Sequence, residues 1–312
     1  MKVLVATDGS ASSEAALDMI TNKPWPKEAN FKVVSVVEPL HSKLDALFVG
    51  GLGDMSRRAQ AAYQADIENV LSQSKTTLAG KFGQDAVSSE VLAGSPADQI
   101  IQAAKTFMAD LIIMGGHFSS AEGWYGSVAR GVTIHAPCSV RIVHPDSSGS
   151  MAKKEEFKED PNETRLLIAV SSPADADLLG ATSISREWPE KSRVQVLSVV
   201  PPFHNNARFG KTKDWQDVAE KAETAAKEHG ETLVETVAVK VRDKFGKENV
   251  TCHVLHGSPR SLILQVAQDW GSDLILMGAH SKDKSLMERV VGSTAAAVVL
   301  NAPCSVELEK HK

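Results

Sequence analysis

Asp110-Leu-Ile-Ile-Met-Gly-Gly-His117 is the stretch that decides the fold, and Asp273-Leu-Ile-Leu-Met-Gly-Ala-His280 repeats it. Each predicts a buried strand that runs directly into a glycine turn, because a short apolar run bounded by a turn signal fits such a strand. A helix is expected to follow, opening at Gly126-Ser127 in the first case and at Gly292-Ser293 in the second. A strand, a flexible turn and a serine-headed helix place backbone N–H groups where an anion can bind.

Both stretches belong to a long internal repeat. An offset of 163 residues relates Trp25-Pro26 to Trp188-Pro189, Lys81-Phe82-Gly83 to Lys244-Phe245-Gly246, and Gly94-Ser95-Pro96 to Gly257-Ser258-Pro259. After the histidine the offset becomes 166, which relates Ala136-Pro-Cys-Ser-Val140 to Ala302-Pro-Cys-Ser-Val306. Solenoid repeats are about 20 to 50 residues long, so a period of this length indicates a duplicated domain.

The repeat predicts two domains joined by a linker. Residues 1–145 form the first domain and residues 165–312 the second, each long enough to bury its own core. Residues 146–164 are polar, highly charged and without an apolar period, which is typical of an interdomain linker.

Composition excludes several classes of protein. The chain is 42% hydrophobic and 23% charged, as expected for a soluble globular protein, and its net charge of −5 argues against nucleic-acid binding. No apolar run approaches the roughly 20 residues of a membrane helix. The N-terminus does not resemble a secretory signal, and three cysteines do not make a disulfide framework. We therefore expect a cytoplasmic protein with no membrane partner.

Strand and helix signals alternate along each half. In the first half strands are predicted at 2–7, 31–37, 86–92, 110–115 and 139–144, and helices at 11–22, at 57–80, from Ser95-Pro96 and from Gly126. The second half repeats this order from Arg165. Alternation of this kind predicts an α/β fold in which helices cover both faces of a five-stranded parallel sheet.

A ligand site is expected at one end of such a sheet. In doubly wound sheets ligands bind outside the carboxyl ends of the strands, where the winding direction switches. Asp8 follows the first strand and Gly115 follows the fourth, so both belong to the correct end. Periodicity does not establish whether these two strands are neighbours.

Several motifs together resemble those of the universal stress protein family. They are Val5-Ala-Thr-Asp-Gly-Ser10, Gly94-Ser-Pro96, the Met-Gly-x-His turn after the fourth strand, and Gly-Ser followed by Ala-Pro-Cys-Ser-Val. The resemblance covers both halves and implies two tandem domains with strand order 3-2-1-4-5. It also implies that ATP, with Mg, is the ligand to consider, and that a homodimer can form through the last strand.

The resemblance carries a set of nucleotide-binding residues onto each half. In the first half they are Thr7, Asp8, Val36, Met114, Gly115, Gly126, Ser127 and Val128; in the second they are Gly278, Ser281, Gly292, Ser293 and Thr294. Each half departs from the family pattern. In the first half Phe118 stands where the second glycine belongs, and only seven residues separate it from Gly126. In the second half Ser171 replaces the acid, and a ten-residue insert separates Ser281 from Gly292. A phenylalanine held at positive φ would be strained, so we expect a reshaped phosphate loop there.

Other interpretations of these residues stay open. Asp8 can be a turn acid that caps the following helix. His41 and His117, whose counterparts in the second half are His204 and His280, can form a metal pair, although no cysteine or acidic cluster accompanies them. Cys138 and Cys304 adjoin predicted buried strands, which favours packing over reactivity.

Three functions follow from these observations. The first is a nucleotide-responsive stress regulator that uses the first domain. The second is a scaffold or interaction protein in which both sites are degenerate, and the third is a slow ATP hydrolase. No nucleophile, base and orienting group can be assembled from the motifs, so we expect a protein that is not an enzyme. The sequence does not identify a protein partner.

Overall fold

The computed structural model describes residues 1–38, 53–116, 118–119, 124–144, 162–202, 213–279 and 291–310. The chain separates into two compact units, Met1–Asp146 and Ser147–His311, and each is described by itself. Of the predicted linker 146–164, only residues 162–164 are described. No helix in the described ranges is both long enough and apolar enough to cross a lipid bilayer.

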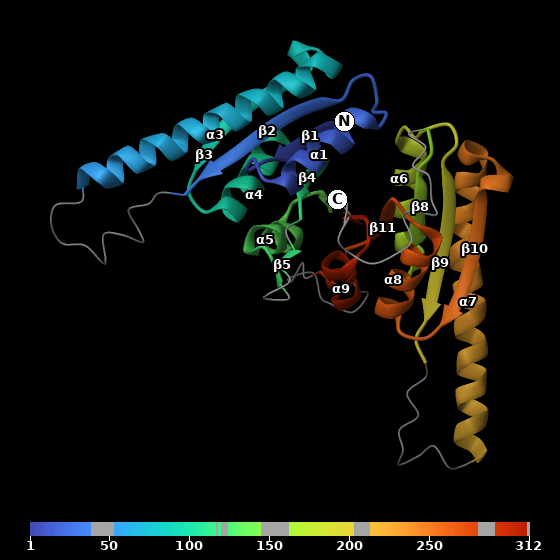
Figure 1. Ribbon diagram of the computed structural model, residues 1–312. Coiled ribbons are helices and arrows are strands. Elements are labelled where there is room, and N and C mark those ends of the chain that lie inside the picture. Colours follow the sequence, from blue (N-terminus) through green and yellow to red (C-terminus); the bar gives the residue numbers. More distant parts are fainter. Residues whose placement is uncertain are drawn as a thin grey trace. The chain divides into compact units, whose positions relative to one another are not determined.

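The first unit is built on a parallel sheet (Figure 1). Its strands are β1 (Lys2–Ala6), β2 (Asn30–Val37), β3 (Val87–Ala93), β4 (Leu111–Gly115) and β7 (Ser139–Val143). They lie in the order β3-β2-β1-β4-β7. This confirms the strand order that the family resemblance implies, and it makes the first and fourth strands neighbours.

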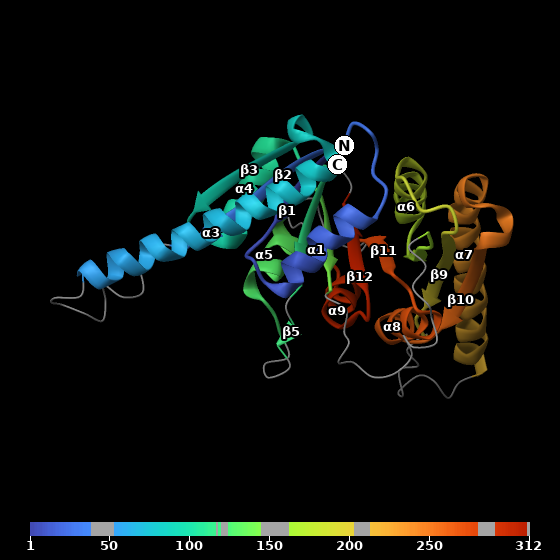
Figure 2. The same ribbon diagram turned by 45° about the horizontal axis from the view of Figure 1, so that its top comes forward.

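Helices cover both faces of this sheet (Figure 2). The helices α1 (Ala11–Asn22) and α3 (Gly53–Phe82) lie on one face, and α4 (Pro96–Phe107) and α5 (Ser127–His135) lie on the other. Helix α3 begins four residues before the predicted 57, because the Gly-rich segment before it already turns helical at Gly53. Ser95 is the N-cap residue of α4, as predicted, but its hydroxyl makes no capping hydrogen bond.

The core of the first unit lies on both sides of its central strands. Val3 and Val5 of β1 pack with Ile20 and Leu78 against α1 and α3, and Leu4 between them is also fully buried. Successive side chains of a strand point to opposite faces, so both faces of β1 are covered. This is the burial that an unbroken apolar run predicts.

The second unit repeats this architecture. Its strands are β8 (Arg165–Ala169), β9 (Arg193–Val200), β10 (Val250–His256), β11 (Leu274–Gly278) and β12 (Ser305–Glu309), in the order β10-β9-β8-β11-β12. Its helices are α6 (Pro173–Ser185), α7 (Lys213–Phe245), α8 (Pro259–Trp270) and α9 (Ser293–Asn301). All described strand pairs within the unit are parallel.

The repeated Trp-Pro motif closes the first helix of each unit. Trp25 Nε1 donates to Ile20 O at 2.9 Å, and Trp188 Nε1 donates to Ser183 O at 2.7 Å. The last carbonyl groups of a helix lack partners within it, so each indole satisfies one of them. The motif therefore stabilises the fold and lies outside the candidate site.

The repeated Lys-Phe-Gly motif acts on the same helix end. Lys81 Nζ donates to the carbonyl oxygens of Thr21 and Lys23, the second at 3.1 Å. In the second unit Lys244 Nζ donates to Ile184 O at 2.8 Å and to Arg186 O. The end of α3 or α7 is thus attached to the end of α1 or α6.

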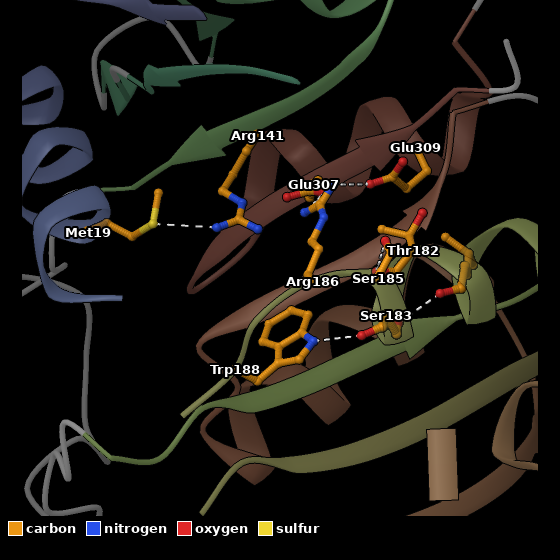
Figure 3. Close-up of polar contacts among 10 residues, drawn as sticks. Met19, Arg141, Thr182, Ser183, Ser185, Arg186, Trp188, Glu307 and Glu309 are labelled. Atoms are coloured by element: carbon orange, nitrogen blue, oxygen red, sulfur yellow. Dashed lines mark hydrogen bonds and ion pairs between the residues drawn. The ribbon is translucent and has the colours of Figure 1, made fainter. Parts of the chain in front are cut away.

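One ion-pair cluster is specific to the second unit (Figure 3). Arg186, at the end of α6, pairs through Nη1 with Glu307 and donates from Nη2 to Glu309 Oε1 at 2.7 Å. Both glutamates are buried residues of β12. By the offset of 166, the counterpart of Glu307 in the first unit is Arg141, which instead donates from Nη1 to Met19 Sδ at 3.4 Å.

Candidate functional site

The neighbouring strands β2, β1 and β4 bring five of the eight predicted residues of the first unit together. Ala6 of β1 pairs with Met114 of β4, so Thr7, Asp8 and Gly115 lie at the same carboxyl end of the sheet. The Thr7 amide donates to Val34 O of β2 at 3.0 Å, which places Val36 at this end as well. We call the eight predicted residues of this unit the first site.

Thr7 is a buried polar residue that organises the turn after β1. Its hydroxyl donates to Ser13 Oγ at 3.1 Å and accepts from the Gly9 amide at 3.4 Å. Ser13 Oγ in turn donates to Ser10 O at 2.9 Å. These bonds fix the backbone between β1 and α1. Thr7 is buried and therefore holds the turn that carries the exposed part of the first site.

Asp8 is exposed, in contrast to Thr7. Its Oδ1 accepts from the Ser10 amide at 3.0 Å, which is the side-chain turn that aspartate commonly forms two residues ahead. Ser10 is the N-cap of α1, and its Oγ accepts from the Ser13 amide at 3.4 Å. The interpretation of Asp8 as the helix cap is therefore wrong, because the neighbouring serine caps the helix and Asp8 presents its carboxylate at the surface.

Gly115 is required for a close approach of backbones. A Cβ placed on Gly115 would lie 2.6 Å from the Ser13 amide nitrogen and would also collide with the Ser12 carbonyl group. The first turn of α1 thus packs directly on the end of β4. Gly115 positions the Asp8 turn, and the structure explains this glycine without a ligand.

Gly126 has the opposite surroundings. It is exposed, and a Cβ placed on it would meet no atom within 4 Å among the described residues. Its amide has no hydrogen-bond acceptor in the described part of the chain. Gly126 is the N-cap of α5, and it provides no side chain to cap the helix.

The start of α5 offers hydrogen-bond donors. The first N–H groups of a helix have no acceptor within it, and the helix dipole adds partial positive charge there. Ser127, exposed, adds a hydroxyl, and Val128 behind it is half-buried. Since α5 connects the parallel strands β4 and β7, it runs antiparallel to them, and its N-terminus belongs to the strand end that carries Asp8.

The backbone at Phe118 is extended. Phe118–Ser119 forms β5 and pairs with β6, Trp124–Tyr125, in an antiparallel hairpin that the sequence did not predict. Among the described residues other than glycine, only Met108 has positive φ. Phe118 is therefore not held at positive φ, and the loop that carries it forms paired strands, which agrees with the expected reshaping. His117 lies outside the described residues, as do His41, His204 and His280.

The second unit places a different group at its strand end. Ser171 Oγ donates to Asp175 Oδ2 at 2.9 Å, and Ser172 Oγ donates to the same oxygen at 2.7 Å. The Asp175 amide donates back to Ser172 Oγ at 3.1 Å. Ser172 is the N-cap of α6, so Asp175 completes a reciprocal cap of that helix.

The start of α9 is tied to the strand end in the second unit. Gly292 N donates to Ala279 O at 2.9 Å. Ser293 is exposed and Thr294 is half-buried, both in the first turn of α9. With Ser171 and Gly278 these residues form what we call the second site; Ser281 lies outside the described residues.

Asp175 is the residue that sequence reasoning missed. The Ser172-Pro-Ala-Asp175 pattern is a helix-start signal with an acid three residues after the cap, and it was available in the sequence. Its contact with Gly278, 103 positions away, could not be predicted from the sequence, because that contact depends on how closely α6 packs on β11.

Neither metal binding nor cysteine reactivity is supported by the described residues. No group of three or more His, Cys, Asp or Glu side chains there is arranged to hold a metal ion. The thiols of Cys138 and Cys304 are buried, and Cys252 is half-buried. Burial raises the pKa of Cys252, since it disfavours the thiolate.

Comparison with known proteins identifies a family whose model matches each half, and relatives that align with about half of the chain. The model of the universal stress protein family matches residues 1–144 and again 153–308. A universal stress protein of Thermus aquaticus is 32% identical over 143 residues, which are 45% of this chain and 96% of the relative. One from Mycobacterium tuberculosis (strain H37Rv) is 31% identical over 144 residues, 46% of this chain and 94% of the relative.

Solved structures share the fold over the whole length. A universal stress protein from Archaeoglobus fulgidus has a TM-score of 0.55 at 19% identity, covering 99% of this chain and 96% of its own. A functionally unknown protein from Pseudomonas aeruginosa has a TM-score of 0.57 at 16% identity, covering 99% and 92%. At these identities the likeness concerns the fold alone.

Proposed function

The chain belongs to the universal stress protein family, with two copies of its domain in tandem, and we propose that it is a stress-response regulator that binds ATP, together with Mg, at the first site. The observation that carries the proposal is the pairing of an exposed carboxylate with an open helix start. Asp8 and Gly126 provide these at one end of the first sheet.

Each end of the first site suits a different part of a nucleotide. The free N–H groups at the start of α5 and the Ser127 hydroxyl would donate to phosphate oxygens, which the helix dipole also favours. Asp8 would repel a phosphate, so it is better suited to accept hydrogen bonds from ribose hydroxyls. Bound Mg would supply positive charge that offsets the triphosphate.

The surroundings of Gly126 support this assignment. A phosphate group needs space beside the helix start, and no described atom occupies the position of a Cβ at Gly126. Thr7, Met114 and Gly115 would form the support beneath the ligand, since Thr7 and Met114 are buried and Gly115 packs on α1. Binding would then change the Asp8 turn and the α5 start, which lie at the surface where a protein partner can detect them.

Equilibrium titration of nucleotide-stripped protein with MgATP tests the proposal. We expect saturable binding that Asp8→Asn and Gly126→Val each abolish. Asp8→Asn keeps an oxygen that can accept from the Ser10 amide, so it removes the charge and leaves the turn in place. Ser293→Ala, at the counterpart of Ser127, is the matched control and should leave the affinity unchanged.

The rival function is a scaffold without a nucleotide. No saturable signal at millimolar ATP would overturn the regulator and favour this rival. A slow hydrolase would be indicated by ADP release over hours that Asp8→Asn removes. We propose a non-catalytic role, because the described residues of the first site include no general base paired with a nucleophile.

A further inference from the structure

We propose that Asp175 closes the second site, so that each chain takes one nucleotide, in its first half. This inference rests on the proposed function of the first site. It assigns to Asp175 the role of deciding which repeat can bind. The argument compares positions related by the offset of 163, where Asp8 corresponds to Ser171 and Ser12 corresponds to Asp175.

In the second repeat the acidic residue lies in the first turn of the helix and not at the strand end. Ser171 stands where the first repeat has Asp8, and its hydroxyl already donates to Asp175 Oδ2. The carboxylate of Asp175 therefore stands four positions, about one helical turn, after the counterpart of Asp8. Asp8 is exposed, whereas Asp175 is 5% exposed, so the second repeat keeps an acid but withdraws it from solvent.

The displaced carboxylate fills the space beside Gly278. A Cβ placed on Gly278 would lie 2.9 Å from Asp175 Cγ and closer still to Oδ1. In the first repeat the same space beside Gly115 is taken by the backbone of Ser12 and Ser13. The helix start of the second repeat is thus supported by a side chain inserted between α6 and β11.

Further hydrogen-bond donors of the second repeat also have acceptors. Ser172 Oγ donates to Asp175, and the Asp175 amide donates back to it. Gly292 N donates to Ala279 O, whereas the amide of its counterpart Gly126 has no acceptor among the described residues. A ligand entering the second site would have to break these bonds, and a buried carboxylate that loses its donors is destabilised.

A reciprocal exchange tests the assignment. The double variant Ser171→Asp with Asp175→Ser recreates the Asp8 and Ser12 pattern in the second repeat. We expect wild-type protein to bind one equivalent of MgATP by calorimetry and the double variant to bind two. Asp175→Ser alone is the matched control; it removes the buried carboxylate without restoring an exposed acid, and it should keep one equivalent.

The outcomes separate this inference from the proposed function. Two equivalents in wild-type protein, or no added equivalent in the folded double variant, would overturn it. If wild-type protein binds none and the double variant binds one, the proposed function fails and the role of Asp175 stands. If neither binds, both fail.

Hydrogen exchange on the wild-type chain gives a second test that needs no variant. Added MgATP should slow exchange at residues 8–13 and 126–129 and leave residues 171–176 and 291–294 unchanged. Equal slowing in both repeats would contradict the inference, even if the double variant does not fold.

Discussion

Gly115 at the end of β4 lies against the backbone of Ser13 in α1, so closely that a Cβ would come within 2.6 Å of the Ser13 amide nitrogen. Because backbone atoms cannot move aside as a side chain can, we expect Gly115→Ala to destabilise the first unit by about 1–3 kcal/mol. Urea unfolding followed by circular dichroism measures this. Gly126→Ala, placed in open space, should change the unfolding free energy by less than about 0.5 kcal/mol. Equal effects of the two substitutions would contradict the contact at Gly115.

The ends of α4 and α8 predict a stabilising substitution. Met108 ends α4 in the left-handed conformation with φ of 54°, where its counterpart Gly271 ends α8 with φ of 66°. The left-handed conformation costs a residue with a Cβ roughly 1–2 kcal/mol, and part of this is offset by the greater freedom of glycine in the unfolded chain.

We therefore expect Met108→Gly to raise the free energy of unfolding by about 0.5–1 kcal/mol, and Gly271→Ala to lower it by about 1 kcal/mol. Chemical denaturation of both variants beside wild-type protein checks the signs. Met108 is 69% exposed, so little packing is lost on its removal. A destabilising Met108→Gly would show that this side chain contributes more than its exposure indicates.

Replacement of Arg186 is expected to cause a large loss of stability. Arg186→Met would leave Glu307 and Glu309 without this cation, and breaking a buried pair in this way costs about 3–5 kcal/mol. Arg193→Met is the matched control. Its partner Glu163 lies at 3.5 Å and the Arg193 side chain is 59% exposed, so the loss should be under about 1 kcal/mol. Comparable losses would mean that the two glutamates are held by other groups.

The pH dependence of the Arg186 contribution has a definite sign. Burial acts to lower the pKa of Arg186, but Glu307 and Glu309 outweigh it, and the pKa is raised. A group with a raised pKa contributes its full stabilisation below its unfolded pKa, which for arginine lies far above neutrality. The contribution of Arg186 to the free energy of unfolding should therefore stay constant between about pH 7 and 9. Urea titrations of wild-type protein and Arg186→Met across this range measure it.

Cysteine reactivity should be low in the native protein. Cys138 and Cys304 are buried, and burial raises the pKa of Cys252, so little reactive thiolate is present near neutral pH. We expect a chromogenic disulfide reagent at pH 8 to react with native protein far more slowly than with urea-unfolded protein. A rapid phase of one equivalent in the native protein, retained in Cys252→Ser, would show that one of the buried thiols is accessible.

Much of the fold was predictable because its signals are local. The apolar run at Leu111–Gly115 predicts a strand from its own residues, and the repeat supplies the strands of the main sheet a second time. The order of the strands came from the family resemblance, since periodicity does not say which strands are neighbours. The β5–β6 hairpin escaped prediction because each of its strands is two residues long.

The candidate site was predictable only as a set of residues. Gly115 and Gly126 look alike in the sequence, yet one is packed against α1 and the other is open. Asp175 was missed because its importance depends on contact with Gly278 from another element. Distances between elements, which side-chain volumes and helix packing determine together, are not encoded in any short pattern.

The indole and lysine contacts that close α1 and α6 lie at the C-terminal end of each helix, whereas the first and second sites adjoin the N-terminal end. Substitutions of exposed residues at the strand ends, such as Asp8, therefore leave these contacts in place. After the duplication, one domain can therefore retain ligand binding while the other diverges in function, and both domains keep the contacts that stabilise the fold.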